Sequence, residues 1–254
     1  MLESSSCKNA TNFIFAALLT GVYDVNRNEL LKKNDFEIIQ KWYDSILKLQ
    51  INAIVFHNSF SKDIVEKYTN EYIRFVEVKY DERLKPNVFR YFVYQDYLKQ
   101  NLKEISNLFV TDITDVEVIN NPFESPVYVE NTDYLFCGDE PEILGNDWMR
   151  NHCSHLRNLM PEFSLYEALN QHETLLNCGV IGANITVMKL LFDNMLAMHE
   201  AFSFTNTTDY TLDMGVFNFV ARTVFAHKIL HGAPVSTVFK KYESQRTDCW
   251  FRHK

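Results

Sequence analysis

The chain has 254 residues, of which 46% are hydrophobic and 23% are charged, a composition typical of a folded domain rather than a disordered chain. Its net charge of −8 argues against an extended nucleic-acid-binding face, which would need an excess of Lys and Arg. The five cysteines are odd in number and form no Cys-x-x-Cys pair, which argues against a disulfide framework and a structural zinc site. We interpret them as reduced thiols of a cytoplasmic protein.

The first half of the sequence alternates short apolar runs with stretches that have apolar residues at helical spacing. The apolar runs predict buried strands at 12–20, 53–56, 73–78 and 108–110. The helical spacing predicts helices at 37–49, 61–69 and 87–102. This alternation is typical of a parallel sheet covered on both faces, so we expect an α/β fold with helices flanking a central sheet. No segment approaches transmembrane length.

The second half is less regular and predicts both strands and helices. Runs rich in β-forming residues predict strands at 127–129, 134–136 and 233–239. Amphipathic patterns predict helices at 187–202 and 212–225. Between them, 175–181 is an apolar run that Asn177 and Gly179 interrupt.

The residues that follow the strands are the first candidates for a functional site, because ligands of such sheets bind at the carboxyl ends of strands. Residues 111–115, Thr-Asp-Ile-Thr-Asp, directly follow the buried run 108–110. Asp112 and Asp115 can converge on one hard cation such as Mg²⁺ or Mn²⁺, which prefers oxygen ligands and completes its shell with waters or phosphates. Alternatively, Asp112 caps a turn and Asp115 is solvated, and the spacing alone favours neither.

The C-terminal His253-Lys254 is a second candidate, because an imidazole can ligate the same cation and a lysine can pair with a phosphate. His231 competes with His253 for the first role. A frayed, solvated end is the alternative for both terminal residues.

Two further segments contain candidate substrate-binding residues. Gly179 and Gly182 in an otherwise apolar segment indicate close approach of the backbone to another group, and Asn177 offers an amide to sugar hydroxyls. The alternative is a tight bend between a strand and a helix. Asp209 and Asp213 precede or open the predicted helix 212–225, where an acid either serves as a general base toward an acceptor hydroxyl or caps the helix.

The chain resembles glycosyltransferases of the GT-A fold, especially the glycogenin and galactinol synthase type. The resemblance rests on the order of four features: the acidic strand end, the Asn-Cys-Gly-Val-Ile-Gly segment at 177–182, the Asp-containing helix start and the terminal His-Lys. The acids of this chain are spaced Asp-x-x-Asp, whereas the family has Asp-x-Asp. The resemblance implies a GT-A, Rossmann-like fold with a mixed, mainly parallel sheet. It also implies one domain over 1–254, with a nucleotide-binding half at about 10–118 and an acceptor half at about 119–254.

The resemblance assigns roles to individual residues. Asp112, Asp115 and His253 would hold Mn²⁺ or Mg²⁺, and Asn177 and Gly179 would contact the sugar or the acceptor. Asp213 or Asp209 would be the catalytic acid-base residue. The donor nucleotide and its diphosphate would be bound by Thr20, Gly21, Tyr23, Arg90, Thr111 and Lys254.

The function implied is metal-assisted transfer of a sugar from a nucleotide-diphosphate donor, a UDP- or GDP-sugar, to a hydroxyl of a glycan or another acceptor. Two alternatives stay open. One is a nucleotidyltransferase or phosphatase that uses the same acidic metal site, and the other is a non-catalytic module that binds nucleotides or sugars. Neither a nucleic-acid partner nor a transmembrane segment is expected.

Overall fold

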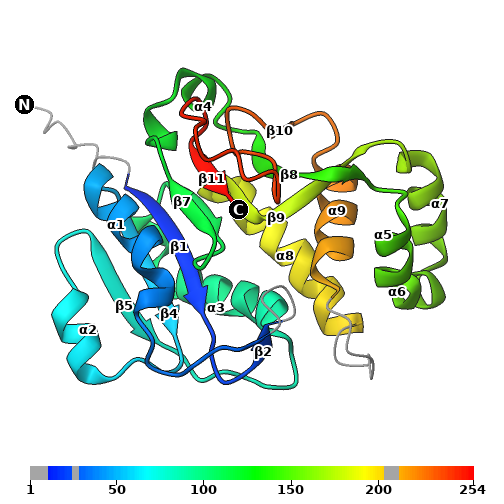
Figure 1. Cartoon of the computed structure of the whole chain (residues 1–254). Coiled ribbons are helices and arrows are strands. Elements are labelled where there is room, and N and C mark those ends of the chain that lie inside the picture. Colours follow the sequence, from blue (N-terminus) through cyan, green and yellow to red (C-terminus); the bar gives the residue numbers. More distant parts are fainter. Residues whose placement is uncertain (1–10, 25–28, 203–211) are drawn as a thin grey trace, which may run out of the picture.

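A computed structural model describes residues 11–24, 29–202 and 212–254 of the chain (Figure 1). Its centre is a seven-stranded sheet in the order β10-β8-β9-β6-β1-β4-β5. Strand β9 pairs antiparallel with both of its neighbours, whereas every other pair in this sheet is parallel. The strands of the sheet are β1 (Asn12–Leu18), β4 (Asn52–His57), β5 (Ile73–Glu77), β6 (Asn107–Thr111), β8 (Leu135–Ile143), β9 (Thr174–Asn184) and β10 (Ile229–His231).

Two small antiparallel pairs lie outside the central sheet. Strand β2 (Tyr23–Asp24) pairs with β3 (Glu29–Leu30), and β7 (Val116–Val118) pairs with the C-terminal β11 (Phe251–His253). The second pair brings the end of the chain to the middle of the molecule, where β11 and β7 lie side by side (Figure 1).

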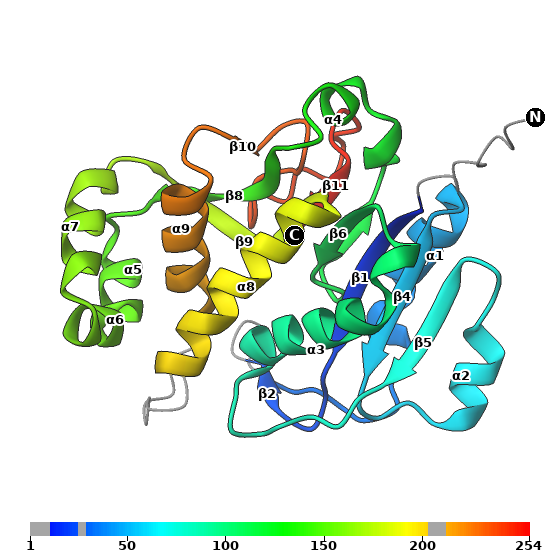
Figure 2. The same cartoon turned by 180° about the vertical axis from the view of Figure 1, so that it is seen from behind.

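Helices cover both faces of the sheet. Helices α3 and α8 pack together on one face of the sheet, which is turned toward the viewer in Figure 2. Helix α1 covers the opposite face. Helices α5, α6 and α7 form a group beyond α9 at one edge. The helices are α1 (Gln40–Leu49), α2 (Lys62–Tyr68), α3 (Pro86–Asn101), α4 (Pro126–Glu130), α5 (Asp147–His152), α6 (Ser154–Leu159), α7 (Pro161–Asn170), α8 (Ile185–Phe202) and α9 (Asp213–Val224), with short 3-10 helices at η1 (Glu37–Ile39), η2 (Leu102–Glu104) and η3 (Pro122–Glu124).

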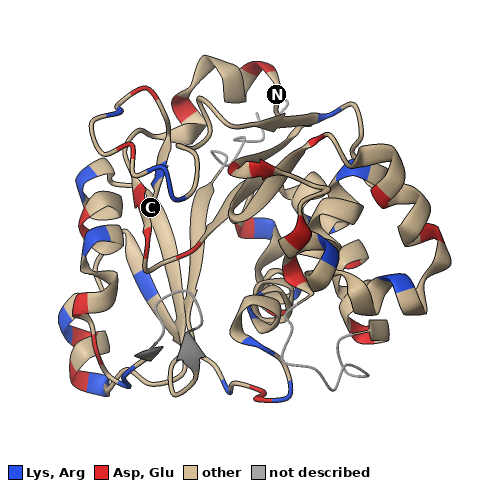
Figure 3. Ribbon diagram, turned by 45° about the vertical axis from the view of Figure 1, so that its right-hand side comes forward, with Lys and Arg blue, Asp and Glu red and all other residues tan. Residues whose placement is uncertain are grey.

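The apolar strand sequences form these strands because side chains alternate between the two covered faces. In β1, Phe13 and Phe15 enter the core beneath α3 and α8, whereas Ile14 and Ala16 enter the core beneath α1. A strand buried on both faces needs apolar residues at successive positions, which explains the continuous runs in the sequence. The central strands accordingly carry few charges, and the charged residues gather on the outer helices and loops (Figure 3).

The predicted α/β class, with a mixed and mainly parallel central sheet between helices, is confirmed. The predicted strand at 127–129 is wrong, because Pro126 occupies the first turn of a helix, α4, in which Tyr128 alone is buried. The predicted strand at 233–239 is also wrong. Pro234 has no N–H for a ladder, and only an isolated bridge joins Ser236 to Phe251.

None of the helices in the described segments has both the length and the apolar character needed to cross a bilayer.

Candidate functional site

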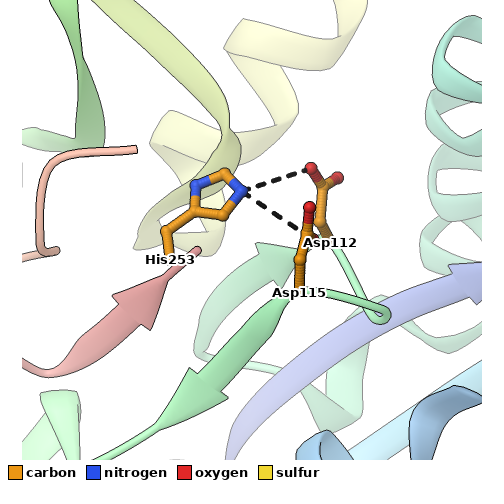
Figure 4. Close-up of side chains that lie close together, drawn as sticks. All are labelled: Asp112, Asp115 and His253. Atoms are coloured by element: carbon orange, nitrogen blue, oxygen red, sulfur yellow. Dashed lines mark ion pairs between the residues drawn. The ribbon is translucent and has the colours of Figure 1, made fainter. Parts of the chain in front are cut away.

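Asp112, Asp115 and His253 converge at the carboxyl end of β6. The two acids lie in the loop between β6 and β7, and the antiparallel register of β11 places His253 opposite Val116 (Figure 4). His253 Nε2 lies 3.8 Å from Asp112 Oδ2 and 3.8 Å from Asp115 Oδ1. One ligand atom from each of the three residues lies within 4.8 Å of the others. The loop after β6 and the pairing of β11 with β7 thus bring the three residues into one cluster, which we call the triad.

The triad is suited to a divalent cation because two of its ligand atoms are buried without hydrogen-bond partners among the described residues. Among the described residues, Asp115 Oδ1 and His253 Nε2 are buried and have no hydrogen-bond partner. A separation of 3.8 Å is too long for a hydrogen bond, but it suits two atoms that share one ion, whose ligands lie about 3 to 4 Å apart at bond lengths of about 2.1 Å. Carboxylates and an imidazole are ordinary ligands for such ions. His231, the competing histidine, instead places Nδ1 2.7 Å from Asp139 Oδ1 and is outside this cluster.

Gly179 forms one wall of the triad. A Cβ at this position would lie 2.3 Å from His253 Cε1 and 2.7 Å from Asp112 Oδ2. The Gly179 carbonyl also accepts a hydrogen bond from the Asp112 backbone N–H at 2.7 Å. The close backbone approach expected at Gly179 therefore occurs, and the groups that approach it are two of the candidate metal ligands.

Arg90 fixes the orientation of Asp112. The buried guanidinium forms an ion pair with Asp112 through Nη1, and Nη2 donates to the Cys178 carbonyl at 3.1 Å. Burial raises the pKa of the Asp112 carboxyl, and the positive charge of Arg90 opposes this effect. Sequence reasoning assigned Arg90 to the donor diphosphate and missed this contact, because the two residues come from different elements, α3 and the β6 end.

Asn177 connects the triad to a carboxylate that sequence reasoning missed. Its Oδ1 accepts from the Gly179 N–H at 2.6 Å, and its Nδ2 donates to Glu140 Oε1 at 2.6 Å. Glu140 follows the buried beginning of β8, as Asp112 follows β6, so acids after an apolar run were the signal that would have found it. Contact of Asn177 or Gly179 with a sugar stays a prediction.

An open pocket of about 510 Å³ lies where β1, β4 and β5 end. It contains the predicted nucleotide-binding residues Thr20 and Gly21, and the Thr20 side chain donates to Ser59 Oγ at 2.6 Å. Tyr23 begins β2, and its side chain lies outside the described part of the structure. The residues that line the pocket are Thr20, Gly21, Lys33, Asn58, Glu77, Val78, Lys79, Tyr80 and Glu82.

Two other predicted donor-binding residues occupy different surroundings. Thr111 is buried, and its hydroxyl accepts from Trp42 Nε1 at 2.8 Å. The Lys254 N–H donates to the Asp115 carbonyl at 3.1 Å, so the terminal residue is held against the triad loop. Partial burial and the neighbouring Lys41 ammonium lower the pKa of the Lys254 side chain. Sequence reasoning did not relate Lys41 to Lys254, because Lys41 belongs to α1 and is far from Lys254 in the sequence.

Of the two candidate acid-base residues, only Asp213 lies in the described part of the structure. Asp213 is the first residue of α9 and is 3% exposed. The Cys178 thiol lies 3.6 Å from its Oδ2, and His152 Nε2 lies 3.9 Å from its Oδ1. Leu212 takes the cap position of α9, so Asp213 does not cap this helix. Asp209 lies outside the described residues, and a catalytic role of either acid stays a prediction.

No known family model matches the chain. No curated protein matches its sequence. Among solved structures, the chain is similar to a glycosyltransferase involved in the glycosylation of the major capsid of PBCV-1, with 10% identity and a TM-score of 0.49. The superposition covers 96% of this chain and 92% of that one. So remote a likeness assigns no activity.

Proposed function

We propose that the chain is a metal-assisted glycosyltransferase of the GT-A type, which transfers a sugar from a nucleotide-diphosphate donor to a hydroxyl acceptor. The observation that carries this proposal is the triad of Asp112, Asp115 and His253, with its two buried ligand atoms that lack hydrogen-bond partners among the described residues. Hydrogen bonds satisfy nearly all buried polar atoms of a folded protein, so two such atoms aimed at one point indicate a missing ligand.

The position of the pocket supports the nucleotide part of the proposal. The pocket follows β1, and β1 is the direct neighbour of β6, whose end carries the triad. Because the two strands are parallel, both ends open at the same edge of the sheet. A volume of about 510 Å³ falls within the range of small-molecule sites. A nucleoside in the pocket would direct its diphosphate toward the triad.

The chain supplies charge and rigidity for this chemistry. A bound cation would neutralise the charge that develops on the leaving diphosphate. Arg90 holds the Asp112 carboxylate in place, and the tie between the Lys254 N–H and the Asp115 carbonyl fixes the loop. Lys41 and Lys254 bring two ammonium groups together, and a phosphate between them would relieve their repulsion. Asp213 or Asp209 would act on the acceptor hydroxyl.

A thermal-shift screen of nucleotide sugars with Mn²⁺, followed by product analysis, tests this function. Binding to the folded state raises the melting temperature, so a UDP- or GDP-sugar should stabilise the protein in the presence of Mn²⁺ and less without it. That donor should then release free sugar and nucleoside diphosphate slowly when no acceptor is present. Release of pyrophosphate or phosphate would indicate a nucleotidyltransferase or phosphatase, and binding without turnover would indicate a binding module.

A further inference from the structure

Glu140 is a carboxylate beside the triad whose position is fixed by the fold. It lies in β8, and its Oε1 accepts from Asn177 Nδ2 at 2.6 Å. The Asn177 Oδ1 is in turn bound to the Gly179 N–H at 2.6 Å, and Gly179 packs against His253 and Asp112. One hydrogen-bonded chain therefore connects Glu140 to the candidate metal centre.

The strand is irregular where it carries Glu140. The pairing of β8 with β9 shifts register between Cys137 and Gly138 and again between Asp139 and Ile143, and Glu140 lies within the second irregular interval. Such irregularities re-aim side chains and are common next to functional sites. Glu140 thus lies in an irregular part of the strand and contacts Asn177, which binds Gly179 at the triad.

Among the described residues, no ion pair or second hydrogen bond within the protein occupies the Glu140 carboxylate. Its neighbour Asp139 pairs with His231 at 2.7 Å, whereas Oε1 of Glu140 receives one hydrogen bond from a neutral amide. Among the described residues, Oε2 has no hydrogen-bond partner and is available to accept one. Burial raises the pKa of this carboxyl, although the hydrogen bond from Asn177 and the charge of Lys240 oppose the shift. A half-buried carboxylate held in this way is typical of a binding site.

Glu140 is also distinct from the metal ligands. Among the described residues, the cluster within 4.8 Å consists of Asp112, Asp115 and His253, and the carboxylate of Glu140 is joined to it through Asn177 and Gly179 rather than belonging to it. The space beside Glu140 is therefore next to the cation site. Under the proposed function, that space receives the sugar, which is bonded directly to the diphosphate. Sugar hydroxyls are donors, and a carboxylate oxygen is a strong acceptor for them.

We propose that Glu140 accepts a hydrogen bond from a hydroxyl of the sugar to be transferred, so that it selects the donor sugar and holds it beside the diphosphate. This inference rests on the proposed function and adds a residue that recognises the sugar. A donor without the matching hydroxyl leaves the carboxylate unpaired, and a site of this kind discriminates strongly against such a donor.

Calorimetry on Glu140→Gln in Mn²⁺ tests the inference. The probes are UDP, GDP and the UDP- or GDP-sugar that stabilises the wild type most. The affinity for the nucleotide sugar should fall about 10-fold or more, because a hydrogen bond to a charged group is lost, and the affinity for the bare diphosphate should stay unchanged. The exposed Glu142, two residues along the same strand, supplies the matched control Glu142→Gln, which should leave both affinities unchanged. Donor hydrolysis without an acceptor should slow in Glu140→Gln as well.

Four results would overturn the inference. If the bare diphosphate loses as much affinity as the nucleotide sugar, Glu140 serves the metal or the fold. If neither affinity changes, Glu140 does not touch the sugar. If transfer slows while donor hydrolysis stays normal, Glu140 acts on the acceptor. If the wild type binds no diphosphate with or without Mn²⁺, the proposed function itself fails, and this inference falls with it.

Discussion

At the residue scale, the triad depends on the absence of a side chain at position 179. A methyl group there would overlap His253 and Asp112, so we expect Gly179→Ala to lower the affinity for a nucleoside diphosphate with Mn²⁺ at least 10-fold by displacing these ligands. Calorimetry measures the loss. Gly138→Ala is the matched control, because its nearest neighbour would be Ser236 Cβ at 3.6 Å, an ordinary contact. Equal affinities in the two variants would contradict the geometry.

The Arg90–Asp112 pair is the other residue-scale feature with a measurable consequence. Arg90→Met leaves the Asp112 carboxylate and the Cys178 carbonyl without their donor, so the free energy of unfolding should fall by about 1–3 kcal/mol. Urea denaturation measures this change. The control is Arg150→Met, because Arg150 is exposed and lies 4.0 Å from Asp147, and it should change stability by about 0.5 kcal/mol or less. A loss no greater than that of the control would contradict the anchoring role of Arg90.

At the element scale, the antiparallel pairing of β6 and β9 depends on a second close approach. Gly182 lies opposite Phe109, and a Cβ there would come within 2.1 Å of the ring. We expect Gly182→Ala to destabilise the fold by about 1–3 kcal/mol, because the ring has to move within a packed core. The double variant Gly182→Ala/Phe109→Leu should be less destabilised than the sum of the single variants, by urea denaturation. Additive losses would show that the ring is not the obstacle.

The elements that could be predicted are those whose pattern is set by local burial. The strands β1, β4 and β6 could be predicted because both faces are covered and their central positions are all apolar. The segment 127–129 has the composition of a strand, but Pro126 and the burial of one tyrosine make it a helix. Sequence periodicity does not report such a tertiary effect.

Some residues of the candidate site could likewise be predicted from the sequence, and others could not. Asp112 and Asp115 could be predicted because they are close in sequence and directly follow a buried strand. The place of His253 beside the two acids depends on the pairing of β11 with β7, which are far apart in the sequence. The chemistry of its imidazole therefore made His253 a candidate, but nothing local distinguished it from His231, and the resemblance alone favoured it. Lys41 joins the site through long-range packing, which leaves no local pattern. Glu140 follows an apolar run as Asp112 does, so its local pattern was readable although its contact with Asn177 was not.

At the scale of the whole molecule, stability should depend on pH through buried histidines. Burial lowers the pKa of His199 from its ordinary value near 6.5 to about 4. Between these values the unfolded chain binds a proton that the folded chain does not, so stability should fall as the pH decreases from about 6.5 to about 4 and should show no His199 contribution above about 7.

The variant His199→Phe isolates this contribution from that of the carboxylates. Its free energy of unfolding, measured by urea denaturation between pH 4 and 8, should fall less steeply below pH 6.5 than that of the wild type. The expected difference in the pH-dependent loss is of the order of 2–3 kcal/mol. Parallel pH profiles for the two proteins would contradict a buried, neutral His199.

The proposed function requires that the triad holds a divalent cation on which a nucleoside diphosphate binds. Titration calorimetry of UDP and GDP into the wild type and Asp115→Ala, each with and without Mn²⁺, tests it most directly. We predict that one diphosphate binds the wild type in Mn²⁺, that its affinity falls sharply without the metal, and that Asp115→Ala loses this metal-dependent binding while remaining folded. Absence of binding by the wild type under both conditions would show that the triad is not a metal-dependent diphosphate site.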